Sequence, residues 1–144
     1  MSSPIPYGCC LPGEDHVVRY CSPTRYDKKT RRPKLVTFQP KPSESYWSVY
    51  RLEFFETERY VALSQLKQHL KSNDILGVRP SGKFLVFNVG LIEKIKIRKL
   101  TVRSKSTPDN PAHAGVEGYT NYDHFVAIAL RNLLIEEGEV VSIG

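Results

Sequence analysis

The sequence predicts an α+β domain in which a mostly antiparallel sheet packs against two helices. Several short runs are rich in Val, Ile, Tyr, Phe and Trp, which favour β-strands, and turn residues separate these runs. Two other stretches place apolar residues at helical spacing. The length of 144 residues fits one domain, and no internal repeat divides it.

The first third of the chain predicts an arm followed by strands. Residues 1–14 are rich in Pro, Gly and Ser, so we expect a flexible N-terminal arm before a single domain over residues 15–144. Residues 16–21, HVVRYC, form the first predicted strand, and KLVTFQ at residues 34–39 forms the next. The strongest strand pattern is SYWSVYRLEF at residues 45–54.

The middle of the chain predicts a helix and then a β-meander. Residues 57–71 carry apolar side chains at helical spacing, with basic residues in the last turn. Residues 75–102 predict the meander, and its central strand is the apolar run FLVFNV at residues 84–89. Residues 91–102 alternate between Ile and Lys or Arg and then slip by one residue after Lys99, which predicts a strand with a bulge or a break there.

A turn-rich loop over residues 104–123 follows, and it presents His113 and Glu117. Residues 122–136 predict the second helix, whose broad apolar stripe indicates a helix packed on the sheet. A last short strand is expected over residues 139–143.

Composition narrows the classes of protein. No apolar run approaches the roughly 20 residues of a membrane span, and residues 1–16 lack the features of a secretory signal, so we expect no membrane association and a cytoplasmic location. Cys9, Cys10 and Cys21 are too few and too irregular for a disulfide framework. With His16 they also lack the two spaced pairs of a structural zinc site, so neither metal nor cofactor is expected.

Standard catalytic and nucleotide-binding signatures are absent from the sequence. It contains no Walker A loop, no GxGxxG, no HExxH, no GxSxG and no EF-hand loop. Three weaker combinations of residues remain as candidates for chemistry or binding.

The first candidate is a cysteine–histidine pair formed by Cys21 and His113. A thiolate nucleophile needs a nearby base and an orienting group, for which Asn88 or Asp109 is available. The segment AHAGVEGY around His113 has some likeness to the histidine region of papain-like proteases. The alternative is that His113 only bonds the backbone of its own loop.

The second candidate joins His16, Arg19, Ser48 and Glu117. In this order the residues resemble the arginine–serine–glutamate arrangement of ADP-ribosyltransferase-like toxins. The resemblance implies a cation near a dinucleotide and a carboxylate that stabilises an oxocarbenium-like centre.

The third candidate is electrostatic, because the net charge is +6. Two basic patches lie near aromatic residues, a combination that suits nucleic-acid binding. The alternatives are that the cations are simply solvated and that aromatics such as Trp47 belong to the core. The candidate nucleic-acid-binding residues are Lys28, Lys29, Arg31, Arg32 and Lys34 in the first patch and Lys94, Lys96 and Arg98 in the second.

Four segments together carry a resemblance at the level of a family. They are DHVVRYC, SVYRLEFF, FNVG and NPAHAGVEG before an apolar helix, and they span most of the chain from Asp15 to Leu134. This combination resembles a family of small uncharacterised bacterial proteins. The resemblance implies a single bacterial domain, of the kind often encoded in toxin, defence or mobile-element operons.

These observations lead to two functional hypotheses. The first is a small cytosolic bacterial binding protein of a defence or toxin–antitoxin-like system, which contacts nucleic acid or a larger protein partner through its basic surfaces. The alternative is an ADP-ribosyltransferase-like or Cys/His enzyme, whose cleft is formed by the HVVRYC strand and the PAHAGVEG loop. The oligomeric state is left open.

Overall fold

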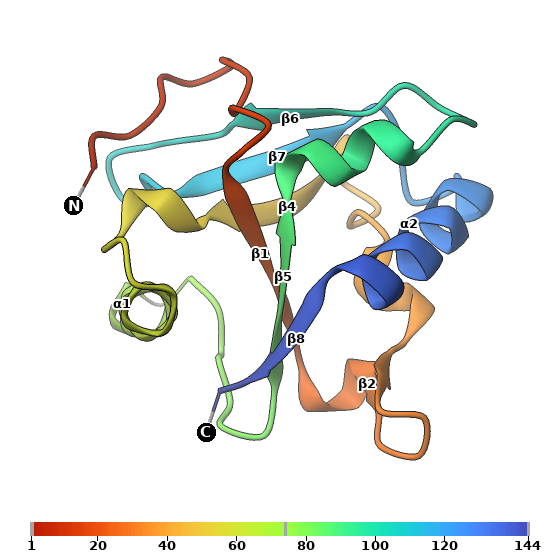
Figure 1. Ribbon diagram of the computed structural model, residues 1–144, viewed down its shortest axis with the longest axis horizontal. Coiled ribbons are helices and arrows are strands. Elements are labelled where there is room, and N and C mark those ends of the chain that lie inside the picture. Colours follow the sequence, from red (N-terminus) through yellow and green to blue (C-terminus); the bar gives the residue numbers. More distant parts are fainter. Residues whose placement is uncertain (1, 74, 144) are drawn as a thin grey trace.

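A six-stranded antiparallel sheet forms the centre of the computed structural model, which describes residues 2–73 and 75–143 (Figure 1). The strand order is β6–β7–β4–β1–β5–β8. The strands are β1 (His16–Cys21), β4 (Tyr46–Arg51), β5 (Lys83–Asn88), β6 (Thr101–Ser104), β7 (His113–Glu117) and β8 (Glu139–Ser142). Met1, Asp74 and Gly144, which fall in the predicted arm and domain, lie outside the described residues.

Two α-helices cover opposite faces of this sheet, α1 (Arg59–Ser72) and α2 (His124–Glu137) (Figure 1). A small separate hairpin pairs β2 (Tyr26–Asp27) with β3 (Arg32–Pro33). The predicted α+β fold with an antiparallel sheet and two main helices is therefore confirmed.

The alternation of side chains along the strands produces two cores, one on each face. On the α2 face, Trp47 and Phe87 stack at the centre of a cluster that includes Leu130. On the α1 face, Val18 and Val86 pack with the buried residues of α1. Those helix residues are Ala62, Leu63, Leu66 and Leu70, and their spacing matches the helical pattern seen in the sequence.

The predicted strand over residues 34–39 is wrong, because a 3₁₀-helix, η2 (Leu35–Phe38), occupies this position. Its Thr37 and Phe38 are adjacent and both fully buried, which a strand with one solvated face does not allow. The next strand also ends earlier than predicted: β4 stops at Arg51, and a second 3₁₀-helix, η3 (Leu52–Phe54), follows.

Of the strand predicted over residues 91–102, with a bulge or break after Lys99, only the end is present, as β6, and residues 91–98 form no strand. A 3₁₀-helix, η4 (Val89–Lys94), follows β5, and strand structure resumes only at β6. The buried residues here are Val89, Ile92 and Ile95, whose spacing of three matches the 3₁₀ repeat. Ile97, which the alternating pattern paired with Ile95, is 60% exposed.

The predicted loop over residues 104–123 contains a strand, β7, in the interior of the sheet between β4 and β6. Gly118 ends this strand with a φ of 114°, a backbone conformation that favours glycine. Both predicted helices, the β5 strand and the final strand β8 are present within a few residues of their predicted bounds.

The segment predicted as an N-terminal arm runs along β6 (Figure 1). The backbone amides of Gly8 and Leu11 donate hydrogen bonds to the carbonyls of Ser104 and Val102, and the Leu11 side chain is buried. Among the helices of the described residues, none has the length and apolar character needed to cross a bilayer.

We expect Leu130→Ala to lower the free energy of unfolding by about 2–5 kcal/mol, because Leu130 is fully buried between α2 and the sheet. Phe125→Ala, a truncation on the same helix at a side chain that is 82% exposed, is the matched control, and we expect a change within about 0.5 kcal/mol. Urea unfolding of both variants measures the difference. Equal losses would contradict the packing described for α2.

Candidate functional site

The sheet splits between β1 and β4, and the split forms a cleft. Among the described residues these strands pair only at Val17 with Arg51 and at Val18 with Tyr50, whereas β1 pairs with β5 from His16 to Cys21. A cleft of about 500 Å³ lies where β1 and β4 part. We call it the β1–β4 cleft, and its central residues are Arg19, Tyr46, Ser48, Tyr50, Asn110 and His113.

Arg19 is a half-buried cation in this split. Its guanidinium lies 5.6 Å from the centre of the Trp47 ring, and its Nη1 donates a hydrogen bond to the Ser48 carbonyl at 2.8 Å. Its Nε is buried and has no hydrogen-bond partner. Among the described residues no carboxylate lies within 4.0 Å of Arg19, and burial together with the nearby Arg25 lowers the pKa of the guanidinium.

Further charges lie around the cleft, and most of them are positive. Arg25 and Lys41 line it, together with the carboxylate of Glu44. Lys41 and Glu44 are 3.9 Å apart, so one positive charge is partly offset while Arg19 and Arg25 are not. The cleft is therefore electropositive, and it suits an anionic ligand.

Ser48 and His113 form a hydrogen-bonded pair on neighbouring strands. Ser48 Oγ and His113 Nε2 are 2.8 Å apart, and both side chains line the β1–β4 cleft. Burial lowers the pKa of His113, so the ring is neutral near pH 7 and Nε2 is able to accept the serine proton. The backbone of Lys105 hydrogen-bonds the same ring and partly offsets the effect of burial on its pKa.

Two tyrosines enclose the imidazole ring. The Tyr50 and Tyr46 rings have their centres 5.6 and 5.9 Å from that of His113. Burial raises the pKa of Tyr50, and burial with the nearby Glu44 raises the pKa of Tyr46 to about 12. Both phenols therefore keep their protons at neutral pH and are available as hydrogen-bond donors.

Of the predicted catalytic residues, the structure brings Arg19 and His113 to the same cleft but not His16. His16 lines a different pocket, where its amide and its Nδ1 bond the two carboxylate oxygens of Glu53 at 2.7 and 2.8 Å. The predicted group of His16, Arg19 and Glu117 therefore does not share one cleft within the described residues.

Cys21 and Glu117 also lie apart from the pair. Cys21 is fully buried on the α2 face with its Sγ 3.3 Å from the Arg25 carbonyl, and burial raises its pKa, which disfavours a thiolate. Glu117 is held by Arg103 and Lys105 at 3.0 and 2.5 Å. Asn88, considered as an orienting group, instead accepts a hydrogen bond from the Gly90 amide.

The first basic patch forms an exposed hairpin with no neutralising partner. Lys28, Lys29, Arg31, Arg32 and Lys34 are all exposed. Within residues 2–73 and 75–143, no carboxylate lies within 4.0 Å of their side-chain nitrogens. We call these five residues the basic hairpin.

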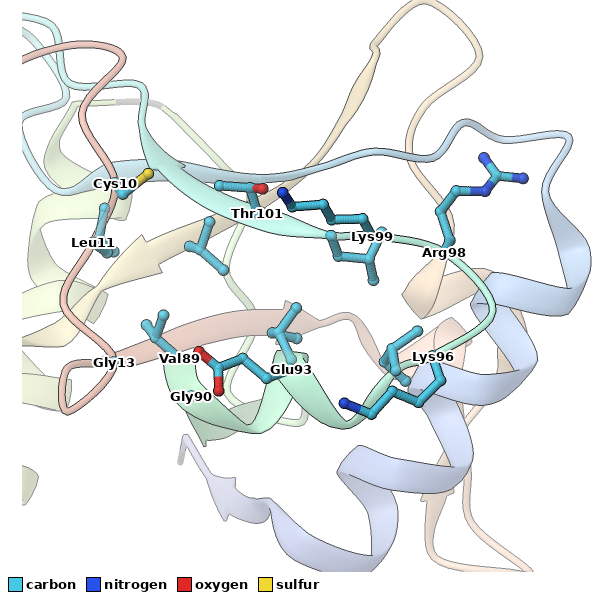
Figure 2. A pocket seen from close by; sticks show the side chains of 14 residues that line it. Cys10, Leu11, Gly13, Val89, Gly90, Glu93, Lys96, Arg98, Lys99 and Thr101 are labelled. Carbon is cyan, nitrogen blue, oxygen red and sulfur yellow. The ribbon is translucent and has the colours of Figure 1, made fainter.

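The second basic patch lies elsewhere, and two of its three cations are paired. Lys94 contacts Glu137 at 2.7 Å, and Arg98 contacts Asp123 at 3.1 Å. Figure 2 shows Lys96 and Arg98 at a second pocket, of about 550 Å³, between η4 and β6. Glu93 lies among these cations and reduces their net charge.

The sequence alone did not indicate Arg25, Lys41 or Glu44 as residues of the site. Ser48 was predicted as a site residue, but with a different partner. A signal for its true partner was available in principle, since Ser48 lies two residues before Tyr50 and β7 presents His113 opposite Tyr50. Finding it required β7 to be recognised as a strand.

Comparisons with protein-family models, with curated proteins and with solved structures found no match for the chain. The resemblance described from the four sequence segments therefore stays a prediction.

We expect Gly115→Ala to distort the cleft, because an added Cβ would lie 2.6 Å from Cδ2 of Tyr46. Displacing this ring from β7 should cost about 1–3 kcal/mol of stability. Gly77→Ala, at a position with open space around the added methyl group, is the control and should change stability by less than about 0.5 kcal/mol. Thermal unfolding of both variants gives the comparison.

We expect His113 to titrate below the ordinary histidine pKa of about 6.5 in an NMR pH titration of its Hε1 proton. Burial is the largest cause of the lowered pKa. The negative charge of Glu44 raises the pKa of His113, whereas the positive charges of Lys105 and Lys41 lower it. Because the unfolded chain binds this proton more readily, the contribution of His113 to stability is most favourable above pH ~6.5 and is lost as the pH falls from there through the lower pKa of the folded state. A midpoint at or above ~6.5 would contradict the burial of the ring.

Proposed function

We propose that this protein binds single-stranded nucleic acid, with one phosphate in the β1–β4 cleft and the neighbouring phosphates along the basic hairpin. The observation that carries the proposal is the half-buried guanidinium of Arg19, whose Nε is buried without a hydrogen-bond partner and which has no carboxylate within 4.0 Å among the described residues. Withdrawing a charge from water without a counter-charge is unfavourable, and a bound anion offsets that cost.

The basic hairpin adjoins the cleft, which favours a polymeric anion over a single small one. The backbone amide of Lys34, at the end of the hairpin, donates a 2.7 Å hydrogen bond to the carbonyl of Arg25, and Arg25 lines the cleft. The hairpin is thus joined through its backbone to Arg25, which lies beside Arg19 at the cleft, while Arg32 and Lys34 also line a neighbouring pocket against α2. A nucleic-acid strand that extends from the basic hairpin to the cleft can therefore place one phosphate near the hairpin cations and another near Arg19.

Aromatic rings at the cleft favour a single strand over a duplex. Tyr20 and Tyr46, which are both partly exposed, line the cleft, and unpaired bases stack on such rings with little dependence on sequence. The second basic patch has no part in the proposal, since Glu137 and Asp123 neutralise two of its cations.

The cellular setting predicted from the sequence is part of the same proposal. A cytosolic bacterial protein of a defence or toxin–antitoxin-like system commonly acts on nucleic acid or on a protein partner that does so. The identity of the neighbouring genes tests this setting independently of any binding measurement.

We expect Lys28→Gln/Lys29→Gln to weaken binding of a fluorescent oligothymidylate and to flatten its salt dependence. Each lost phosphate contact should reduce the slope of log K against log salt concentration by about 0.7. Fluorescence anisotropy between about 50 and 200 mM salt measures both quantities.

Lys94→Gln/Arg98→Gln is the matched control, because it removes the same charge from cations that are already paired. We expect its salt slope to equal that of the unmodified protein. Binding by the unmodified protein that does not change with salt, or equal losses in the two double variants, would overturn the proposal.

A further inference from the structure

We propose that the Ser48–His113 pair is catalytic: Ser48 attacks a phosphodiester of the strand held in the β1–β4 cleft, and His113 acts as the general base. This inference rests on the proposed nucleic-acid binding and adds an activity to it. The 2.8 Å contact between Ser48 Oγ and His113 Nε2 carries it, because a serine hydroxyl becomes a useful nucleophile only beside a base.

The surroundings of the pair supply the other groups that such a reaction needs. The backbone of Lys105 raises the pKa of His113 and therefore acts as a hydrogen-bond acceptor for the ring; with Nε2 at Ser48, the donor to it is Nδ1–H, which fixes the ring orientation. The Arg19 guanidinium is anchored on the carbonyl of Ser48 itself, so a positive charge is fixed beside the nucleophile. That charge stabilises the additional negative charge of a pentacovalent phosphorus.

Tyr50 is a neutral donor in the same cleft. It lines the β1–β4 cleft with Ser48 and Asn110, and its ring centre lies 5.6 Å from that of His113. Burial raises the pKa of Tyr50, so the phenol stays protonated and its proton is available to a phosphoryl oxygen.

The first step forms one bond and breaks one bond. Ser48 Oγ bonds to phosphorus as its proton passes to His113 Nε2, and the bond from phosphorus to one sugar oxygen breaks. The imidazolium returns the proton to that departing oxygen, which leaves as a free hydroxyl. The products are a phosphodiester between Ser48 and one strand fragment, and a second fragment that ends in a hydroxyl.

The second step restores the serine. His113 Nε2 takes a proton from water, the water oxygen bonds to phosphorus, and the bond from phosphorus to Ser48 Oγ breaks. The proton on His113 then returns to Ser48. The net reaction is hydrolysis of one phosphodiester, with no change in oxidation state.

A biotinylated fluorophosphonate tests the nucleophile directly, because an activated serine displaces its fluoride and keeps the phosphonyl group. We expect peptide mass spectrometry to find the label on Ser48 of the full chain. Removing a general base typically costs about 100-fold or more, so His113→Gln should lower the labelling rate by at least that factor, and Ser48→Ala should abolish labelling.

Ser22→Ala is the matched control, since Ser22 lines the same cleft but its hydroxyl pairs with Thr24 at 3.3 Å and not with a histidine. We expect this variant to be labelled like the unmodified protein. No labelling of the unmodified protein, or equal labelling of Ser48→Ala, would overturn the proposed nucleophile.

The substrate is tested with a 5′-labelled single-stranded oligonucleotide. We expect the unmodified protein to give an adduct that survives denaturing electrophoresis and a shortened strand, and Ser48→Ala to bind the oligonucleotide without forming either. Binding without fluorophosphonate labelling would overturn the catalytic role and leave the proposed function standing. Labelling of Ser48 without oligonucleotide binding would overturn the proposed function and, with it, the phosphodiester substrate.

Discussion

The half-buried guanidinium of Arg19 makes the interaction on which the polar centre of this protein depends. Where β1 and β4 stop pairing, Arg19 spans the gap by bonding the Ser48 carbonyl and lying over the Trp47 ring. The cation thus occupies the gap between the strands and lines the cleft that the split opens. The fold solvates this charge only in part, since its Nε has no hydrogen-bond partner.

The same burial gives opposite charge states to the groups around the cleft. Removal from water lowers the pKa of His113 far enough to leave a neutral imidazole, whereas arginine retains its charge because its ordinary pKa is so high. A neutral base and a fixed cation therefore lie side by side. In bulk water the electrostatic effect of the cation would be weaker, because solvent screens the charge.

The sequence predicted those elements in which one periodicity decided the structure. β1, β5 and both helices follow alternation, an apolar run or a helical stripe, and their positions are confirmed. The prediction from sequence failed at η4. There the alternation of Ile95 and Ile97 resembles a strand, although the buried residues Val89, Ile92 and Ile95 are three positions apart. It failed at β7 because small residues flanked by Pro and Gly resemble a turn, whereas Gly115 in fact makes room for the Tyr46 ring.

The site was predicted only in part, since strand pairing and not residue type decides which side chains meet. Alternation separates Arg19 from His113, because Val18, Tyr50 and His113 share one face of the sheet and Arg19 begins on the other. In an intact ladder Arg19 would therefore stay in the α2 core. A residue on one face reaches a site on the other only where the ladder beside it is broken. The split between β1 and β4, which no pattern in the sequence reports, is what makes Arg19 a neighbour of Ser48 and His113.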